Sequence, residues 1–163
     1  MTASTAIDIH DATAADLDAL VELAVGLRDH LRQSTPTAAA LRDGFVRLLA
    51  DDAARFVVAR DADGAALGYV QCRYRFSAWT GGSDVELEDV FVADAARRRG
   101  VGRQLVAAAL AQARRAGCRT AVLTTNERNA AALALYEAIG FRADKARWDG
   151  GRQLWLEKEL AAE

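Results

Sequence analysis

The stretch from residue 84 to residue 125 constrains the fold most, because it contains a strand, a turn, a helix and a second strand in succession. Residues 84–92 are rich in β-branched and apolar side chains, and residues 120–125 again predict a short strand. Between them, residues 101–116 are rich in alanine and leucine, and Gly117 follows where a left-handed residue commonly ends a helix. A strand–helix–strand unit joins parallel strands, so the sheet must contain a parallel pair.

Two helices and two hairpins account for most of the remaining chain. Thr13 and Asp16 resemble a capping box, and Thr35 followed by Pro36 predicts the start of a second helix. Outside the unit described above, we expect strands at 7–12, 55–61, 66–76, 141–148 and 153–159, a loop at 77–83 and a helix at 129–139 ended by Gly140. This order predicts an α/β (mixed α+β) fold, with a central twisted sheet of about seven strands flanked by about four helices.

Length and charge narrow the class of protein. A chain of 163 residues has the size of one domain, so we expect a single domain over residues 1–163. The formal charge of -2 disfavours nucleic acid as a partner. No window has the length and hydropathy of a membrane span or a signal segment, so we expect a cytoplasmic protein without a membrane partner. The two cysteines, Cys72 and Cys118, have no metal-ligand spacing, and we expect no metal.

A basic, glycine-containing turn at residues 97–102 stands between a predicted strand and the helix that follows it. Backbone amides at a helix N-terminus bind phosphate, and the glycines at Gly100 and Gly102 let an anion approach the main chain. Four arginines would neutralise a pyrophosphate and a further phosphate: Arg97, Arg98, Arg99 and Arg103. A solvated basic turn is the alternative. A dinucleotide fingerprint and a Walker loop are both excluded by the spacing.

The motifs together resemble one enzyme family. Residues 87–92 (LEDVFV), the turn at 97–102, Asn129, residues 135–137 (LYE) and Gly140 with Phe141 follow the order and spacing of the GNAT N-acetyltransferases. The resemblance covers nearly the whole chain. Within the family, residues 87–89 and the upstream Trp79 are similar to the spermidine/spermine acetyltransferase branch.

This resemblance implies a GNAT-like acyl-CoA N-acyltransferase fold that binds acetyl-CoA where two parallel strands separate. Main-chain groups of Val90, Phe91 and Val92 would bind the pantetheine. The turn and its helix start would bind the pyrophosphate through Arg97, Arg98, Arg99, Gly100, Val101, Gly102 and Arg103. Asn129 would also touch the cofactor.

Two side chains are candidates for proton transfer. An alkylamine with a pKa of about 10.4 is neutral in roughly one molecule in a thousand or two at pH 7, so it must lose a proton before it attacks. Glu88, beside the expected acetyl site, is the candidate base or ammonium contact. Tyr136 is the candidate general acid, because a phenol with a pKa of about 10 stays protonated to donate to the leaving thiolate. The alternatives are a solvated strand residue for Glu88 and a core tyrosine for Tyr136.

The acceptor is expected to be a small-molecule amine that is cationic in solution. The predicted strand carries Asp84, Glu86, Glu88 and Asp89, and Trp79 is expected either to wall the acceptor pocket or to anchor its loop. Strict alternation places Glu86 and Glu88 on one face and Asp89 on the other, unless a bulge intervenes. Acetylation of a protein N-terminus or lysine, and a non-catalytic acyl-CoA-binding module, stay open as alternatives. The family resemblance also favours a homodimer.

Overall fold

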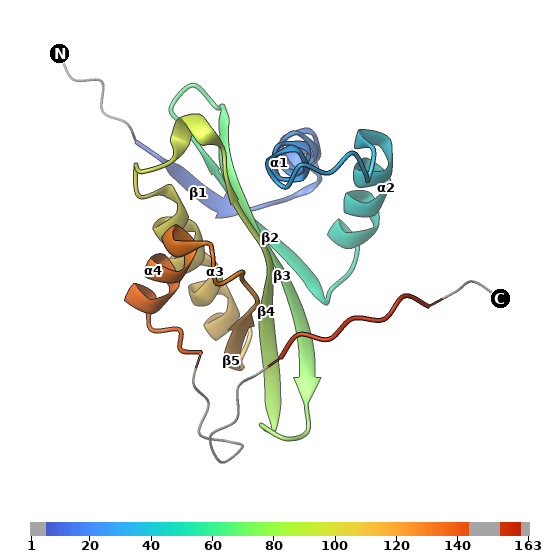
Figure 1. Ribbon diagram of the computed structural model, residues 1–163, viewed down its shortest axis with the longest axis vertical. Coiled ribbons are helices and arrows are strands. Elements are labelled where there is room, and N and C mark those ends of the chain that lie inside the picture. Colours follow the sequence, from blue (N-terminus) through green and yellow to red (C-terminus); the bar gives the residue numbers. More distant parts are fainter. Residues whose placement is uncertain (1–5, 144–153, 161–163) are drawn as a thin grey trace. The chain divides into compact units, whose positions relative to one another are not determined.

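The computed structural model describes residues 6–143 and 154–160, and the chain divides into two compact units, Met1–Thr124 and Thr125–Glu163. The first unit holds one five-stranded sheet in the order β1-β2-β3-β4-β5 (Figure 1). Its strands are β1 Asp8–Asp11, β2 Ala54–Arg60, β3 Ala66–Ser77, β4 Gly82–Val92 and β5 Cys118–Leu123. All neighbours are antiparallel except β4 and β5, which are parallel. The predicted mixed sheet with one parallel pair is confirmed.

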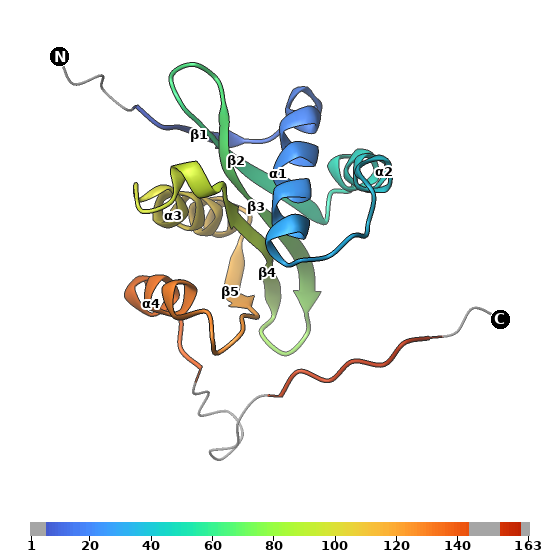
Figure 2. The ribbon, with the colours of Figure 1, turned by 45° about the horizontal axis from the view of Figure 1, so that its top comes forward.

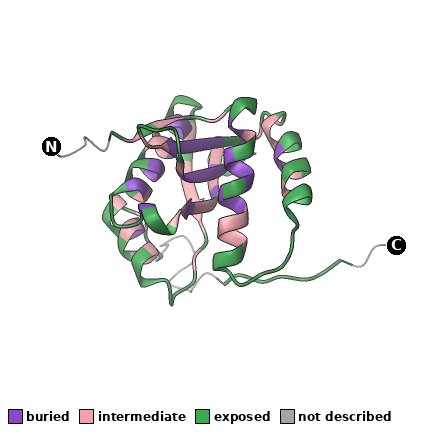
Figure 3. Ribbon diagram, turned by 90° about the horizontal axis from the view of Figure 1, so that it is seen from above, coloured by how far each residue is buried: buried purple, intermediate pink, exposed green. Residues whose placement is uncertain are grey.

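Helices cover both faces of this sheet (Figures 1 and 2). Helices α1 (Leu17–His30) and α2 (Ala38–Leu49) lie on one face, where Phe45 contacts the rings of Phe56 and Tyr69 edge-on. Helix α3 (Val101–Arg115) lies on the other face and buries Leu105, Val106, Ala109 and Ala113. Figure 3 shows the buried residues along the strands and on the helix surfaces turned toward them. The sheet therefore has a separate hydrophobic core on each face.

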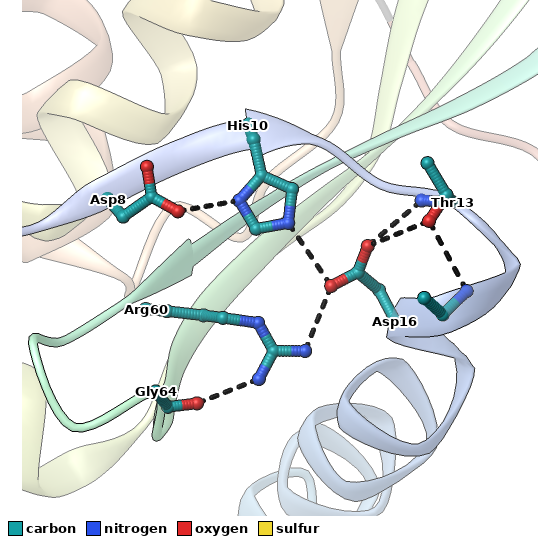
Figure 4. A network of polar contacts seen from close by, with 7 residues as sticks. Asp8, His10, Thr13, Asp16, Arg60 and Gly64 are labelled. Atoms are coloured by element: carbon teal, nitrogen blue, oxygen red, sulfur yellow. Dashed lines mark hydrogen bonds and ion pairs between the residues drawn. The ribbon is translucent and has the colours of Figure 1, made fainter.

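The predicted capping box precedes α1 and is confirmed (Figure 4). The Thr13 amide donates to Asp16 Oδ2 at 3.0 Å, and the Ala15 amide donates to Thr13 Oγ1 at 3.3 Å. Asp16 Oδ1 also lies 2.9 Å from Arg60 Nη2 and 3.1 Å from His10 Nε2. Burial alone would raise the pKa of Asp16, but these hydrogen bonds and charges lower it to about 2.

Helix α2 begins two residues later than predicted. Thr37, not Thr35, is its N-cap, and the Thr37 hydroxyl accepts from the Ala40 amide at 3.2 Å. The Pro36 carbonyl instead accepts from Arg28 Nη1 of α1 at 3.1 Å, which holds this residue ahead of the helix. The sequence contains two threonines two residues apart, and it is the hydroxyl of the second, Thr37, that accepts from the otherwise unpaired amide of Ala40.

The hairpin of β3 and β4 is longer than predicted, because ladder pairing continues to Ser77 opposite Gly82. The predicted loop at 77–83 shrinks to a turn over residues 78–81, where Gly81 has a φ of +65°. Strand β5 likewise begins at Cys118 rather than Thr120, in register with Ser83 of β4. Both differences lie at strand ends, which depend on pairing with a neighbour.

A bulge in β4 overturns the expected alternation of its side chains. Gln71 pairs with Asp89 and the next residue, Cys72, pairs with Leu87, so Glu88 is an extra residue in the ladder. Leu87 therefore lies in the core under α3, whereas Asp89 and Phe91 lie on the face of α1 and α2. Strict alternation would have kept Leu87 and Asp89 together, and the bulge is the exception under which this alternation was expected to fail.

The second unit contains helix α4 (Ala130–Ile139), which confirms the predicted helix. Asn129 is its N-cap and accepts from the Ala132 amide at 3.2 Å, and Gly140 ends it with a φ of +105°. The predicted strand at 153–159 is not formed in residues 154–160, which are exposed and pair with no described strand. Residues 144–148 of its expected partner lie outside the described residues. The described sheet thus has five strands rather than about seven, because an alternating pattern forms a strand only when a neighbour supplies its ladder.

Candidate active site

The basic turn leads directly into the N-terminus of a helix, which is the position that the sequence predicts for it. A short 3-10 helix, η2 (Asp94–Ala96), leads into the turn, and Gly100 is the N-cap of α3 with a φ of +77°. Arg98 also has a positive φ of 62°. The first amides of α3 have no partner within the helix and point away from its N-terminus, where the helix dipole favours an anion.

The arginines of this turn divide into two groups. Arg97 turns back toward the sheet, where its Nε donates to the Val92 carbonyl at 3.1 Å and its Nη2 lies 2.9 Å from Asp94. Its guanidinium also lies over the Phe91 ring, 5.9 Å from the centroid. Arg98, Arg99 and Arg103 are exposed and make no hydrogen bond or ion pair with any residue the structure describes. These three are the cations left for phosphate groups.

Beside this turn, strands β4 and β5 separate. Their pairing runs from Ser83 with Cys118 to Leu87 with Leu123, where β5 ends. Strand β4 continues to Val92 and is held there only by β3 among the described residues. The main-chain groups of residues 88–92 on the β5 side are therefore open to a ligand. This stretch includes Val90, Phe91 and Val92, although the Val92 carbonyl already accepts from Arg97.

A cavity of about 320 Å³ lies on one face of the sheet, between the sheet and helices α1 and α2. Its volume falls at the lower end of the range for small-molecule sites. Most of its walls are apolar and include Leu27, Pro36, Leu41, Phe45 and Leu48. The strands contribute three polar side chains, Tyr69, Gln71 and Asp89. This combination of apolar walls and a few polar groups is typical of a ligand pocket.

The polar groups of the strands form two hydrogen-bonded pairs across the bulge. The Tyr69 hydroxyl donates to Asp89 Oδ2 at 3.1 Å, and Gln71 Nε2 donates to Glu88 Oε2. Burial raises the pKa of Asp89, while the hydrogen bond from Tyr69 opposes that rise. Glu88 is exposed, whereas Asp89 is half-buried. The bulge thus brings two carboxylates to neighbouring but different environments.

Two predicted acceptor residues lie outside the lining of this cavity. Glu86 pairs with Arg73 in the β3–β4 ladder. Trp79 is 80% exposed in the hairpin turn at residues 78–81 and is not buried as an anchor. Of the predicted acceptor contacts, the structure places Asp89 in the cavity wall and Glu88 beside it.

The second unit holds the remaining candidates, Asn129 and Tyr136. The Asn129 side-chain oxygen caps α4. Tyr136 is 9% exposed and contacts the Phe141 ring, with centroids 5.8 Å apart. Burial raises the pKa of Tyr136, so its phenol keeps its proton over a wider pH range. The hydroxyl forms no hydrogen bond with the part of the chain that the structure describes.

Tyr69 and Gln71 were not predicted from the sequence as site residues. The signal was present in residues 68–72 (GYVQC), where two polar-tipped side chains stand two apart in an otherwise apolar strand and so share one face. A tyrosine in a strand is commonly a core residue, and only the bulge in β4 reveals its carboxylate partner.

Comparison with known proteins agrees with this geometry. The model of the acetyltransferase (GNAT) family matches residues 20–141. An aminoglycoside N(6')-acetyltransferase type 1 of Salmonella typhimurium is 36% identical over 120 residues, covering 71% of this chain and 81% of that protein. An L-methionine sulfoximine/L-methionine sulfone acetyltransferase of Pseudomonas paraeruginosa is 31% identical over 139 residues, covering 82% and 78%.

Among solved structures, AAC(6')-Iy in complex with the bisubstrate analog CoA-S-monomethyl-acetylneamine superposes with a TM-score of 0.75. It is 28% identical, and the match covers 96% of this chain and 100% of that one. The open edge of β4 and the amides and free arginines at the start of α3 fit a CoA group. The chain therefore belongs to the acetyltransferase (GNAT) family and is an acetyl-CoA-dependent N-acetyltransferase.

Proposed function

We propose that this enzyme transfers the acetyl group to the primary amine of a small molecule that is cationic in solution, by direct attack while both substrates are bound. One observation carries the proposal. Residues 88–92 of β4 are open to a ligand along the β5 edge, and the same segment places Glu88 and Asp89 beside the cavity on the face covered by α1 and α2. A single strand segment can therefore bring an acyl donor and a cationic acceptor together.

The cofactor contacts follow from the same geometry. Main-chain groups of Val90, Phe91 and Val92 would hold the pantetheine along the open edge of β4. The amides of Gly100, Val101 and Gly102 would hold the pyrophosphate, with Arg98, Arg99 and Arg103 around it. Arg97 would act indirectly, since its contacts with Val92 and Asp94 fix the start of the turn. Asn129 caps α4 and would present its amide nitrogen to the cofactor.

Acetyl-CoA, when bound, supplies a thioester carbonyl carbon to which the amine nitrogen adds as the C–S bond breaks. Glu88 holds the incoming ammonium and takes its proton, directly or through a water molecule. Tyr136 gives its proton to the departing sulfur, and the raised pKa of the phenol keeps that proton available at neutral pH. The nitrogen then loses its second proton, which restores the Tyr136 phenol, and Glu88 releases the first proton to solvent, which leaves an amide, a free thiol and one proton in solution.

The nature of the acceptor is supported by charge and by the relatives. Glu86, Glu88 and Asp89 favour a cationic molecule over an anionic one. The relatives are named for acetylating aminoglycosides and L-methionine sulfoximine or sulfone, which are small molecules that carry an amine. A spermidine/spermine-like acceptor belongs to the same chemical class and stays within the proposal. Trp79 would contact such a molecule only at the tip of the β3–β4 hairpin.

The proposal includes one catalytic domain over residues 1–163. The match to the family covers residues 20–141 and so extends into both compact units. A cytoplasmic location and a homodimer are further parts of the proposal. No helix in residues 6–143 or 154–160 has both the length and the apolar character needed to cross a membrane.

The test is a screen of acceptors with acetyl-CoA, read as a mass gain of one acetyl group and as release of free thiol. The panel contains small amines, polyamines, aminoglycosides, amino acids and lysine-containing peptides. We expect acetylation of at least one small cationic amine, with peptides inactive. Acetylation of peptides alone, or thiol release without any acetylated amine, would contradict the proposal.

A further inference from the structure

The charge inside the cavity is lower than the acidic sequence of β4 suggests. Among the described residues that line it, only Asp89 and Arg28 carry charge. Arg28 donates to Asp29 Oδ1 through Nε and Nη2, at 2.9 and 2.7 Å, so its charge is already paired. The other carboxylates of β4 lie outside the lining. The cavity therefore presents one unpaired negative charge within apolar walls.

The carboxylate of Asp89 accepts a hydrogen bond from the hydroxyl of Tyr69, a residue that has no exposure to solvent. Tyr69 is 0% exposed, its ring contacts Phe45, and its hydroxyl donates to Asp89 Oδ2. A buried carboxylate stays ionised only when neighbouring donors stabilise it. Glu88 differs, since it is exposed and bonded to Gln71. The two carboxylates therefore have separate supports and can have separate tasks.

We infer that Tyr69 is a positioning residue that holds Asp89, the carboxylate in the described cavity lining, so that it anchors the same ammonium from which Glu88 takes a proton. The cavity then selects amines with one cationic group on an apolar body and discriminates against polycationic acceptors. This inference rests on the proposed function and narrows its acceptor class. A second ammonium would lie against the apolar side chains of Leu27, Leu41 and Leu48 without a partner, which is costly in a partly dehydrated site.

Among the residues that the structure describes around Asp89, no charged group provides an anchor for a second ammonium. Helix α1 contributes Arg28, whose charge is paired with Asp29, and β3 contributes the neutral Tyr69. On β4 the neighbouring charge is Glu88. Helix α2 lines the cavity with no titratable side chain, and the connecting segment contributes only Gln33, Thr35 and Pro36.

The first test compares substrates on the unmodified enzyme with acetyl-CoA. Hexylamine and 1,6-diaminohexane have the same carbon chain and differ by one ammonium group. We expect kcat/KM to be at least tenfold higher for hexylamine. In the series from propylamine to hexylamine, KM should fall about fourfold for each added methylene until the cavity is full. Preference for the diamine or for spermidine, or a flat series, overturns the inference.

The second test uses Tyr69→Phe, with Tyr74→Phe as the matched control. Tyr74 lies in the same strand, and its hydroxyl donates to Gln112 Oε1 of α3 at 3.0 Å, on the opposite face. We expect Tyr69→Phe to raise KM for hexylamine roughly tenfold, the effect of losing a hydrogen bond to a charged group, with kcat within twofold. Tyr74→Phe should leave both unchanged.

The pH profile separates positioning from packing. The hydrogen bond from Tyr69 lowers the pKa of Asp89, so its removal should raise that pKa and shift the acid limb of kcat/KM to higher pH. An unshifted limb in a folded Tyr69→Phe protein overturns the inference. If that variant does not fold, the substrate series still decides the question. Failure of every amine to be acetylated would count against the proposed function itself.

Discussion

At the scale of single residues, Glu88 and Asp89 are adjacent in β4 yet differ in exposure, in partner and in the task proposed for each. Glu88 is exposed and bonded to Gln71, so it can exchange protons with water. Asp89 is half-buried beneath Tyr69. The sequence predicted both as acceptor contacts, but it could not predict their different exposure and partners, because these arise from the bulge.

Glu88→Gln should both raise KM for the amine and lower kcat, because the amide keeps the shape of the side chain but loses its charge and basicity. Steady-state kinetics with the best acceptor from the screen measures both effects. Asp63→Asn, in the exposed β2–β3 turn, is the control for a lost surface charge. A change confined to KM would limit Glu88 to ammonium binding.

Tyr136→Phe should lower kcat by about ten- to a thousandfold, the range for a lost general acid, with little change in KM for acetyl-CoA. The substitution keeps the ring that contacts Phe141, so the fold of α4 should persist. Circular dichroism checks that persistence. A variant with the kcat of the wild type would assign Tyr136 to packing.

Asp16 allows a prediction about stability and pH. Its pKa of about 2 lies below the ordinary value near 3.9, so its ionised form stabilises the fold by about 2 kcal/mol above pH 4. That contribution is lost as the pH falls from about 4 to about 2. Asp16→Asn should lower Tm at pH 7 by about 4 to 8 °C and have little effect near pH 2.

Asp8→Asn is the matched control for Asp16, because Asp8 contacts the same His10 ring but its side chain is 71% exposed. Its removal should change Tm by less than about 2 °C. An equal loss of Tm at pH 2 and pH 7 in Asp16→Asn would indicate altered packing rather than lost charge.

At the scale of secondary structure, local chemistry predicted some elements well. The capping box at Thr13 and the glycines after α3 and α4 mark helix ends through their own backbone geometry. Other features depend on distant partners. The start of α2 depends on the contact of Pro36 with Arg28, and the bulge depends on the register of β3 with β4. Such features cannot be found in a local sequence window.

The start of α3 can be tested as an element. Gly100→Val should abolish acetyl-CoA binding, because a β-branched side chain is strained at a φ of +77° and would cover the amides of the turn. Titration calorimetry measures the binding. Gly117→Val is the matched control, since Gly117 follows the same helix with a φ of +79° and an added Cβ there meets no atom within 4 Å.

Gly100 and Gly117 have nearly the same positive φ, so valine should strain the backbone similarly at either end of α3. The two variants can therefore be compared directly. We expect Gly117→Val to be destabilised to a similar degree but to bind acetyl-CoA with unchanged affinity. If Gly100→Val is folded and binds as the wild type does, the turn at residues 97–102 is not the pyrophosphate site.

At the scale of the whole molecule, acetyl-CoA binding should be coupled to stability. At a concentration of 100 Kd, a ligand that binds only the folded state adds about 2.7 kcal/mol, which corresponds to about 5 to 11 °C in Tm for a chain of this length. Calorimetry should show one cooperative transition that moves as a whole. Two transitions, of which only one moves, would contradict a single domain over residues 1–163.

The bulge at Glu88 has a consequence for how this enzyme can diversify. Because of the bulge, Leu87 faces the core under α3, whereas Asp89, two residues later, faces the acceptor cavity. Because Glu88 is the extra residue, deleting it would leave Leu87 and Asp89 opposite consecutive residues of β3, each on its present face. We therefore expect the acceptor range to change through replacement of side chains such as Tyr69 and Asp89, and we expect loss of Glu88 to remove a carboxylate without moving Asp89 or Phe91 to the α3 face.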